Sequence, residues 1–318
     1  MNLKDDSRVP DAGDDPLSPC RVCPRSCGAL RTAGETGFCG LDSRLHVSWA
    51  GLHFGEEPPL SGEGGVGNFF FTSCNLSCVY CQNHQISQGR APDRVMSPDE
   101  FALKALELEA AGASFVGLVS ASHQVPQVRE ALILAKKRGL AIPILYNSSA
   151  YDSVESLKSL ENLVDVYLPD LKYADDAVAL RYSSAPGYVA AARNAILEMH
   201  RQVGDPVFDP ATGLVSRGLW VRHLVLPQGL AGTWESLCFL ALEVSTKIGL
   251  SLMAQYEPMH RAREFPELNR RISPAEYEEA LDMARDLGFS TILAQDLAES
   301  PDNAVPDFTD ESAPFKRF

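Results

Sequence analysis

The sequence predicts an α/β fold in which about six strands alternate with helices, preceded by a small cysteine-rich segment. Short apolar runs of strand length recur along the chain, and stretches with helical periodicity separate them. Strands that alternate with helices pair in parallel through right-handed crossovers. Six such units fit an open doubly wound sheet or a complete or partial α/β barrel. The glycine-rich stretch 62–67 precedes a strand instead of following one, which weakens the dinucleotide-binding alternative.

The expected elements follow one another in a regular order. Apolar runs predict strands, with a weaker seventh at the end, at 68–72, 114–119, 141–146, 164–169, 219–226, 250–256 and 290–294. Helical patterns predict helices at 98–111, 125–138, 152–161, 186–203, 233–247 and 274–287. Ser97 and Glu100 have the spacing of a capping box at the start of the first helix. The sequence "KKRG" has the basic residues and glycine that end the second helix.

The strand and helix region, 67–295, is flanked by segments of different composition. Residues 1–17 are polar and acidic and are predicted to be a disordered tail, and residues 296–318 form an acidic C-terminal tail. Residues 18–66 are rich in cysteine and glycine and show little periodicity. We therefore expect metal ligands, rather than a hydrophobic core, to hold that segment together.

The charge balance narrows the range of partners. The chain carries 28 Lys and Arg against 42 Asp and Glu, a net charge of -14. Such a surface repels phosphate groups, so nucleic acid and anionic membranes are not expected partners. The N-terminus has no apolar signal region and no stretch is long enough to span a membrane, which predicts a cytoplasmic protein. In a reducing compartment, cysteines are metal ligands more often than disulfides.

Three cysteines, Cys74, Cys78 and Cys81, directly follow the first predicted parallel strand with the spacing C-x3-C-x2-C. That places them at the carboxyl end of the strand, where α/β barrels build their active sites. Three thiolates on a 4Fe–4S cluster leave one iron without a protein ligand, and that iron can bind a substrate or cofactor. The alternative is a structural zinc knuckle that takes its fourth ligand from elsewhere in the chain.

With an aromatic residue, Tyr80, before the last cysteine, this motif resembles the signature of the radical SAM superfamily. The stretches "CRVCPRSCGALRTAGETGFCG", "CNLSCVYCQN", "VYLPDLKYAD", "VRHLVLP" and "LMAQYEP" extend the resemblance, over about residues 18 to 290, to the pyruvate formate-lyase activating enzyme-like branch. The resemblance implies a partial (β/α)6 barrel and a 4Fe–4S cluster whose open iron binds S-adenosylmethionine. It also implies a one-electron donor such as flavodoxin or ferredoxin.

The activity implied by the resemblance is reductive cleavage of S-adenosylmethionine, followed by hydrogen abstraction by a 5′-deoxyadenosyl radical. In true activases the hydrogen comes from a backbone glycine of a partner, a glycyl-radical enzyme. Two alternatives stay open: radical chemistry on a small molecule, and a non-catalytic iron–sulfur or zinc-binding protein.

Residues near the ends of later strands complete the expected cofactor site, together with Tyr80. Ser122 and His123 follow the second strand, where the branch has a related segment, although Ser122 also suits a helix cap. By resemblance, Lys172 meets the cofactor carboxylate and Asp170 orients it or holds a monovalent cation. A mutual structural pair is the alternative for these two residues.

Arg222 lies within the apolar run of the fifth strand, where a buried guanidinium needs an anion. That anion is either the cofactor carboxylate or an acidic partner in a core ion pair.

Four further cysteines, Cys20, Cys23, Cys27 and Cys39, follow the pattern C-x2-C-x3-C-x11-C. Four ligands leave no spare position, as in a structural zinc site or a fully ligated iron–sulfur cluster. A cluster could relay electrons, whereas zinc would only stabilise the segment.

Overall fold

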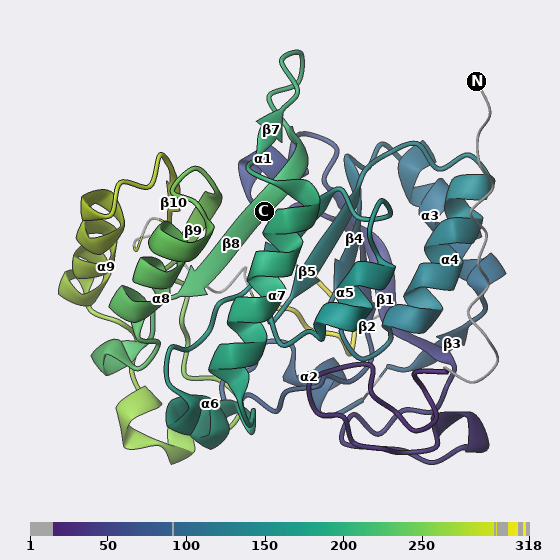
Figure 1. Ribbon diagram of the computed structural model, residues 1–318, viewed down its shortest axis with the longest axis horizontal. Helices are drawn as coiled ribbons and strands as arrows, with labels where there is room; N and C mark the ends of the chain where they lie inside the picture. The colour runs from purple at the N-terminus through teal and green to yellow at the C-terminus, as the bar shows by residue number, and fades with distance from the viewer. Residues whose placement is uncertain (1–14, 91, 296, 298–304, 311–313, 316–318) are drawn as a thin grey trace.

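The computed structural model describes residues 15–90, 92–295, 297, 305–310 and 314–315. One curved sheet forms its centre, with the strand order β10-β9-β8-β6-β5-β4-β2-β1-β3 and β7 paired to β8 (Figure 1). Among the described residues, seven strands pair in parallel and confirm the predicted series, including the weak seventh. They are β2 (Val66–Phe71), β4 (Phe115–Val119), β5 (Ile144–Ser148), β6 (Val166–Pro169), β8 (Val215–Leu224), β9 (Gly249–Met253) and β10 (Thr291–Ala294).

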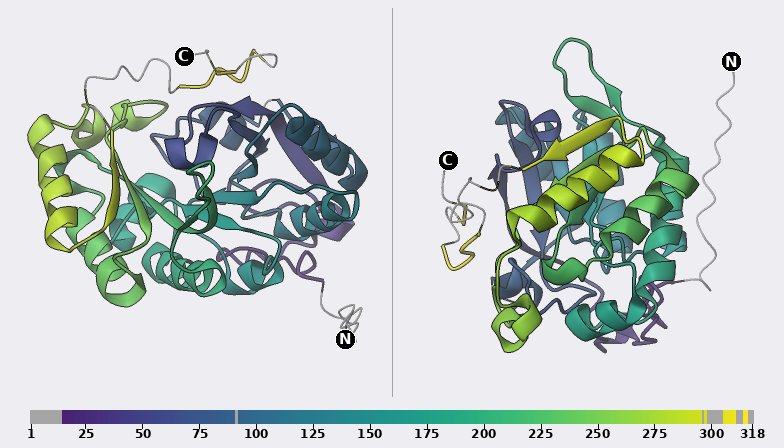
Figure 2. Two further views of the ribbon diagram at one scale, coloured as in Figure 1. Left: turned by 90° about the horizontal axis from the view of Figure 1, so that it is seen from above. Right: turned by 90° about the vertical axis from the view of Figure 1, so that its left-hand side faces the viewer.

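Helices cover one face of the sheet, and Figure 2 shows α4, α5 and α7 on the side opposite the C-terminal segment. The α-helices of the described residues, not all of which lie on that face, are α1 (Pro58–Ser61), α2 (His84–Ser87), α3 (Pro98–Ala110), α4 (Val125–Lys137), α5 (Val154–Ser159), α6 (Asp176–Ser183), α7 (Tyr188–Val203), α8 (Thr233–Phe239) and α9 (Pro274–Asp286). Ser97 and Glu100 form the predicted capping box of α3. No pairing between the two end strands of the sheet is found in the described part of the chain, so the barrel is partial. Within those residues, no helix combines the length and apolar character needed to cross a membrane.

The cysteine-rich segment contributes a strand that the sequence pattern did not predict. β1 (Leu45–His53) pairs antiparallel with β2 and, on its other edge, with β3 (Arg94–Met96). Leu45 and Val47 are buried in the main hydrophobic core. The expectation that ligands alone hold residues 18–66 is therefore wrong, because the second half of the segment is part of the sheet.

The predicted tails can be compared with the structure only in part. Residues 1–14 lie outside the described residues, as do 296, 298–304, 311–313 and 316–318. The C-terminal residues that are described pack against the sheet: Phe308 is buried against Phe70 of β2, and Phe315 contacts Phe70 and Trp49. At least these residues are therefore not a free tail.

The concave face of the sheet carries an apolar floor and a polar layer. Phe69 stacks on Phe101 of α3 with ring centroids 4.1 Å apart, so its neighbours Asn68 and Phe70 face the concave side. The apolar floor consists of Leu60, Val66, Phe115, Leu145, Val166, Leu168, Val215 and Trp220. Gly117 leaves room for the Asn68 amide, since a Cβ at this glycine would lie 1.8 Å from Asn68 Oδ1.

An ion cluster forms the polar layer. Arg222 of β8 donates to both carboxylate oxygens of Glu57, with its Nε 2.8 Å from Oε1, and also pairs with Glu56. Asn68 Nδ2 donates to Glu56 Oε1 at 2.8 Å, and Ser251 Oγ donates to Glu57 Oε1 at 2.7 Å. Of the two partners that the sequence left open for Arg222, the core ion pair is the one formed.

Arg222 also favours the ionised form of the Glu57 carboxyl group. Burial acts to raise the pKa of Glu57, but the guanidinium outweighs it and holds the pKa below the ordinary value. The ionised carboxylate therefore contributes stability above the pKa of the unfolded chain, and that contribution is lost as the pH falls through the folded-state pKa.

We predict that Arg222→Met lowers the free energy of unfolding by about 3–5 kcal/mol at pH 7, because it leaves buried carboxylates without a counter-charge. Arg285→Met is the matched control, since Arg285 pairs with the exposed residues Glu278 and Asp282, and it should cost no more than about 1 kcal/mol. Urea unfolding followed by circular dichroism measures both values.

The loss in Arg222→Met should shrink between pH 7 and pH 4.5, as the unpaired carboxylates become protonated in the folded variant. Equal, small losses in the two variants would contradict this account of the layer.

Candidate active site

The loop that carries Cys74, Cys78 and Cys81 lies between β2 and α2, at the carboxyl ends of the parallel strands. It begins at Ser73, whose φ of 69° is left-handed. Backbone hydrogen bonds tie it to α6, from Ser77 N to Ser183 O at 2.9 Å and from Val79 N to Tyr182 O at 2.8 Å. α6 was not predicted from the sequence, yet it fixes the shape of this loop.

Each thiol of the loop has a polar hydrogen-bond partner. Leu76 N donates to Cys74 Sγ at 3.3 Å, and Ser183 Oγ donates to Cys78 Sγ at 3.0 Å. Cys81 Sγ lies 3.2 Å from Ser87 Oγ. The Leu76 N–H and the Ser183 hydroxyl place positive dipoles at Cys74 and Cys78, where they stabilise a thiolate.

The three thiols lie close enough to affect one another's ionisation. Burial, followed by the charge of Cys78, raises the pKa of Cys74 to about 12 and that of Cys81 to about 11. Burial also raises the pKa of Cys78. Without a metal the thiols are therefore protonated at neutral pH, and binding a metal centre would release their protons.

Tyr80 begins a buried chain of hydroxyl groups that leads back to Cys78. Its OH lies 2.5 Å from the OH of Tyr173, which lies 2.7 Å from Ser183 Oγ, the donor to Cys78. Tyr173 lies in the quoted stretch "VYLPDLKYAD" but was given no role by the sequence analysis, and Ser183 was missed because it belongs to no recognisable motif.

Lys172 and Asp170, near the end of β6, lie beside the cysteine loop. Lys172 Nζ is 2.7 Å from Asp170 Oδ2, and the two side chains are 16% and 22% exposed. Burial acts to lower the pKa of Lys172, but the charges of Asp170 and then Cys78 outweigh it and raise the pKa above the ordinary value. The structure thus forms the mutual pair and also places its ammonium within the electrostatic reach of Cys78.

Ser122 and His123, after β4, take part in other buried contacts. Ser122 lies within hydrogen-bonding reach of Asp152, and the cap of α4 is Gln124, so the alternative that Ser122 caps this helix is wrong. His123 Nε2 donates to Thr72 O at 2.9 Å, while its buried Nδ1 has no hydrogen-bond partner. Burial lowers the pKa of His123 to about 4, so the ring is neutral.

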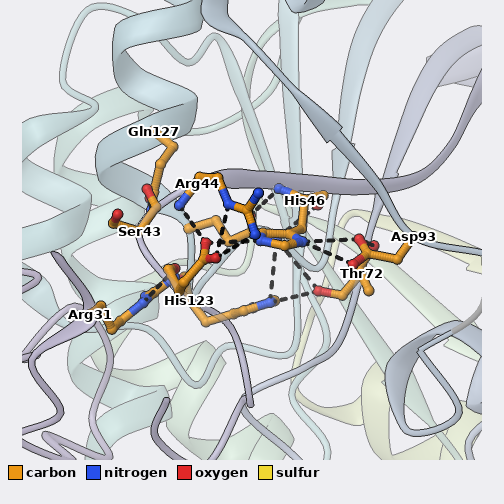
Figure 3. A network of polar contacts seen from close by, with 10 residues as sticks. Arg31, Ser43, Arg44, His46, Thr72, Asp93, His123 and Gln127 are labelled. Carbon is orange, nitrogen blue, oxygen red and sulfur yellow. Dashed lines mark hydrogen bonds and ion pairs between the residues drawn. The ribbon is translucent and has the colours of Figure 1, made fainter. Parts of the chain in front are cut away.

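A polar network ties the cysteine-rich segment to the sheet beside this site (Figure 3). His46 of β1 lies at its centre, with Nε2 3.0 Å from Asp42 Oδ1 and Nδ1 3.0 Å from Asp93 Oδ2. Thr72 Oγ1 donates to Asp93 at 2.9 Å. The other labelled members are Arg31, Ser43, Arg44, His123 and Gln127.

The four N-terminal cysteines surround one small cavity, as a shared site requires. Cys20, Cys23 and Cys39 are buried, and Cys27 is exposed. In the described residues, no three His, Cys, Asp or Glu side chains are spaced to hold a single metal ion.

Comparison with known proteins places this geometry in a family. The family model described as the radical SAM superfamily matches residues 68–214, which include the cysteine loop. The uncharacterized protein MJ0674 of Methanocaldococcus jannaschii is 30% identical over 282 residues, covering 86% of this chain and 76% of that protein.

Solved structures resemble the chain at lower identity. The hydrogenase maturase HydG from Carboxydothermus hydrogenoformans is 12% identical with a TM-score of 0.47, over 70% of this chain and 50% of its own. A domain of a pyruvate formate-lyase-activating enzyme from Bacteroides vulgatus is 13% identical with a TM-score of 0.39, over 54% and 91%.

The family match spans the strand, the cysteine loop and the following units that build the site. The chain therefore belongs to the radical SAM superfamily, and is an enzyme that uses a 4Fe–4S cluster, S-adenosylmethionine and an electron donor.

Proposed function

We propose that Cys74, Cys78 and Cys81 bind three irons of the 4Fe–4S cluster and leave the fourth iron for S-adenosylmethionine. The observation that carries this proposal is the convergence of three half-buried, hydrogen-bonded thiols with the Lys172–Asp170 pair at the same end of the sheet. When bound, the reduced cluster supplies one electron that breaks the S–C5′ bond, and the resulting 5′-deoxyadenosyl radical takes hydrogen from a substrate.

The residues around the loop support that chemistry in distinct ways. Lys172 offers a charged donor for the methionine carboxylate, and Asp170 holds the ammonium in place. Ser183 donates to Cys78, and Tyr173 and Tyr80 extend the hydroxyl chain behind it. Hydrogen bonds to the sulfur ligands are one of the features that set a cluster's reduction potential.

His123 and Arg222 have less support as direct contacts to the cofactor. The guanidinium of Arg222 already pairs with two carboxylates, and the one ring nitrogen of His123 that donates is occupied by Thr72 O.

The first test is reductive cleavage of S-adenosylmethionine by anaerobically reconstituted, dithionite-reduced protein. We predict one 5′-deoxyadenosine for each methionine formed, and a loss of at least 100-fold in Cys78→Ala, because one cluster ligand is missing. Cys238→Ala is the control and should retain the activity, since this cysteine lies on α8, away from the loop. Equal activity in Cys78→Ala and wild type would contradict the proposal.

The second test separates a cofactor role of Lys172 from a purely structural pair. Lys172→Met should raise the Kd for S-adenosylmethionine about 10- to 100-fold, because a hydrogen bond to a charged group contributes about 1.5–3 kcal/mol. Arg270→Met, which removes an exposed pair with Glu276, should leave the Kd unchanged. Isothermal titration of the reconstituted variants measures it, and an unchanged Kd in a less stable Lys172→Met protein would indicate a structural pair only.

For the hydrogen donor, we propose a glycyl-radical enzyme, supported by the resemblance to the activating-enzyme branch. The packing of Phe308 and Phe315 against Phe70, on the open side of the sheet, favours a smaller substrate as the second candidate. A stable organic radical on an added glycyl-radical enzyme, seen by electron paramagnetic resonance, would support the activase. Deuterium transfer from a labelled small molecule into 5′-deoxyadenosine would support the second candidate.

A further inference from the structure

The cavity enclosed by Cys20, Cys23, Cys27 and Cys39 is lined by two arginines and by no acidic residue. The guanidinium of Arg31, which is 1% exposed, donates to Asp42 O and His123 O, and its Nη1 lies 3.9 Å from Cys20 Sγ. Arg25 donates to the backbone carbonyls of Asn75 and Ser184. Within the described part of the chain, neither arginine has a carboxylate at ion-pair distance.

The buried guanidinium of Arg31 needs a compensating negative charge, and the half-buried Arg25 adds to the positive charge of the cavity. Four thiolates around a metal centre carry a net negative charge and would supply it at this position. The charge alone suits zinc and an iron–sulfur cluster equally, so the neighbourhood of the cavity has to distinguish them.

One side of this cavity is formed by Asn75, a residue of the active-site loop. Asn75, the neighbour of Cys74 in sequence, is 2% exposed and lines the cavity. Its Oδ1 accepts from Cys74 Sγ at 3.8 Å, and its side chain is also within hydrogen-bonding reach of Cys23. Cys27 lies at the exposed side of the same cavity. The four cysteines thus lie between the protein surface and the first cysteine of the active site.

We propose that Cys20, Cys23, Cys27 and Cys39 bind a second iron–sulfur cluster that relays electrons to the cluster at Cys74. One electron enters from a flavodoxin- or ferredoxin-type donor at the Cys27 side, which oxidises that donor by one electron. The same electron passes by way of Asn75 to the cluster at Cys74 and is consumed in breaking one S–C5′ bond, so that no net charge stays on the relay. The relay, but not the binding of the second cluster, rests on the function proposed above for Cys74.

The binding step is tested by counting metal in variants that remove one site at a time. Cys74→Ala/Cys78→Ala/Cys81→Ala should keep half of the wild-type iron and sulfide after anaerobic reconstitution, with a reduced-cluster resonance that S-adenosylmethionine does not change. Cys20→Ala/Cys23→Ala should keep the other half and a resonance that the cofactor does change. Zinc without iron in the triple variant, or no metal at all, would overturn the assignment.

The relay is tested by comparing two reductants. Cys20→Ala/Cys23→Ala and Asn75→Leu should lose at least tenfold in 5′-deoxyadenosine formation with reduced flavodoxin, relative to their rate with dithionite, whereas Cys238→Ala should show the wild-type ratio. Because Asn75→Leu keeps all eight cysteines, it also tests the relay if the double variant fails to fold. An unchanged ratio in Asn75→Leu and the double variant would overturn the relay.

The two proposals fail in different ways. One result would refute the function proposed for Cys74 and still support the second cluster. In that result the wild-type protein has a single cluster that does not respond to S-adenosylmethionine, and the triple variant retains its iron.

Discussion

The loop at the end of β2 must hold three half-buried thiols in fixed positions, although it is too short to form a core of its own. Its backbone and side-chain hydrogen bonds therefore go to distant parts of the chain. α6 holds the loop at Ser77 and Val79, Ser73 bonds to the backbone of Cys39, and Arg261 N donates to Val79 O. This constraint explains why the cysteine-rich segment, α6 and the region after β9 all meet at one end of the sheet.

The positively charged side chains of the barrel also depend on partners from other parts of the chain. At the floor, Arg222 is neutralised by Glu56 and Glu57, and at the strand ends Lys172 is paired with Asp170. Arg25 and Arg31 have no such partner in the described residues and lie against cysteines instead. In the low dielectric of a protein interior, an unpaired cation such as Arg31 is costly, and this arrangement supports an anionic metal centre at the four N-terminal cysteines.

Much of the fold could be predicted from the sequence because its signals are local. Most of the parallel strands contain a short apolar run, and the capping box of Ser97 and Glu100 lies within four residues. β1 was missed because residues 18–66 were taken as a cysteine- and glycine-rich segment, although Leu45–His53 partly alternates apolar and polar residues as a strand does. The packing of Phe308 could not be predicted either, since an acidic tail gives no indication of which surface it covers.

The candidate site likewise contains residues that could be predicted from the sequence and residues that could not. The spacing of Cys74, Cys78 and Cys81, and the pair of Asp170 and Lys172, are visible in the sequence. The partner of Arg222 is not visible, because Glu57 lies 165 residues away and precedes the first parallel strand. Ser183 could not be predicted for the same reason, since its role depends on α6 packing against the loop.

The open iron is the central claim, and electron paramagnetic resonance tests it most directly. Anaerobically reconstituted protein, reduced with dithionite, should give a cluster signal with a component that changes when S-adenosylmethionine is added. That component should be absent in Cys78→Ala. A spectrum that the cofactor leaves unchanged, or a cofactor-sensitive component that persists in Cys78→Ala, would contradict the account.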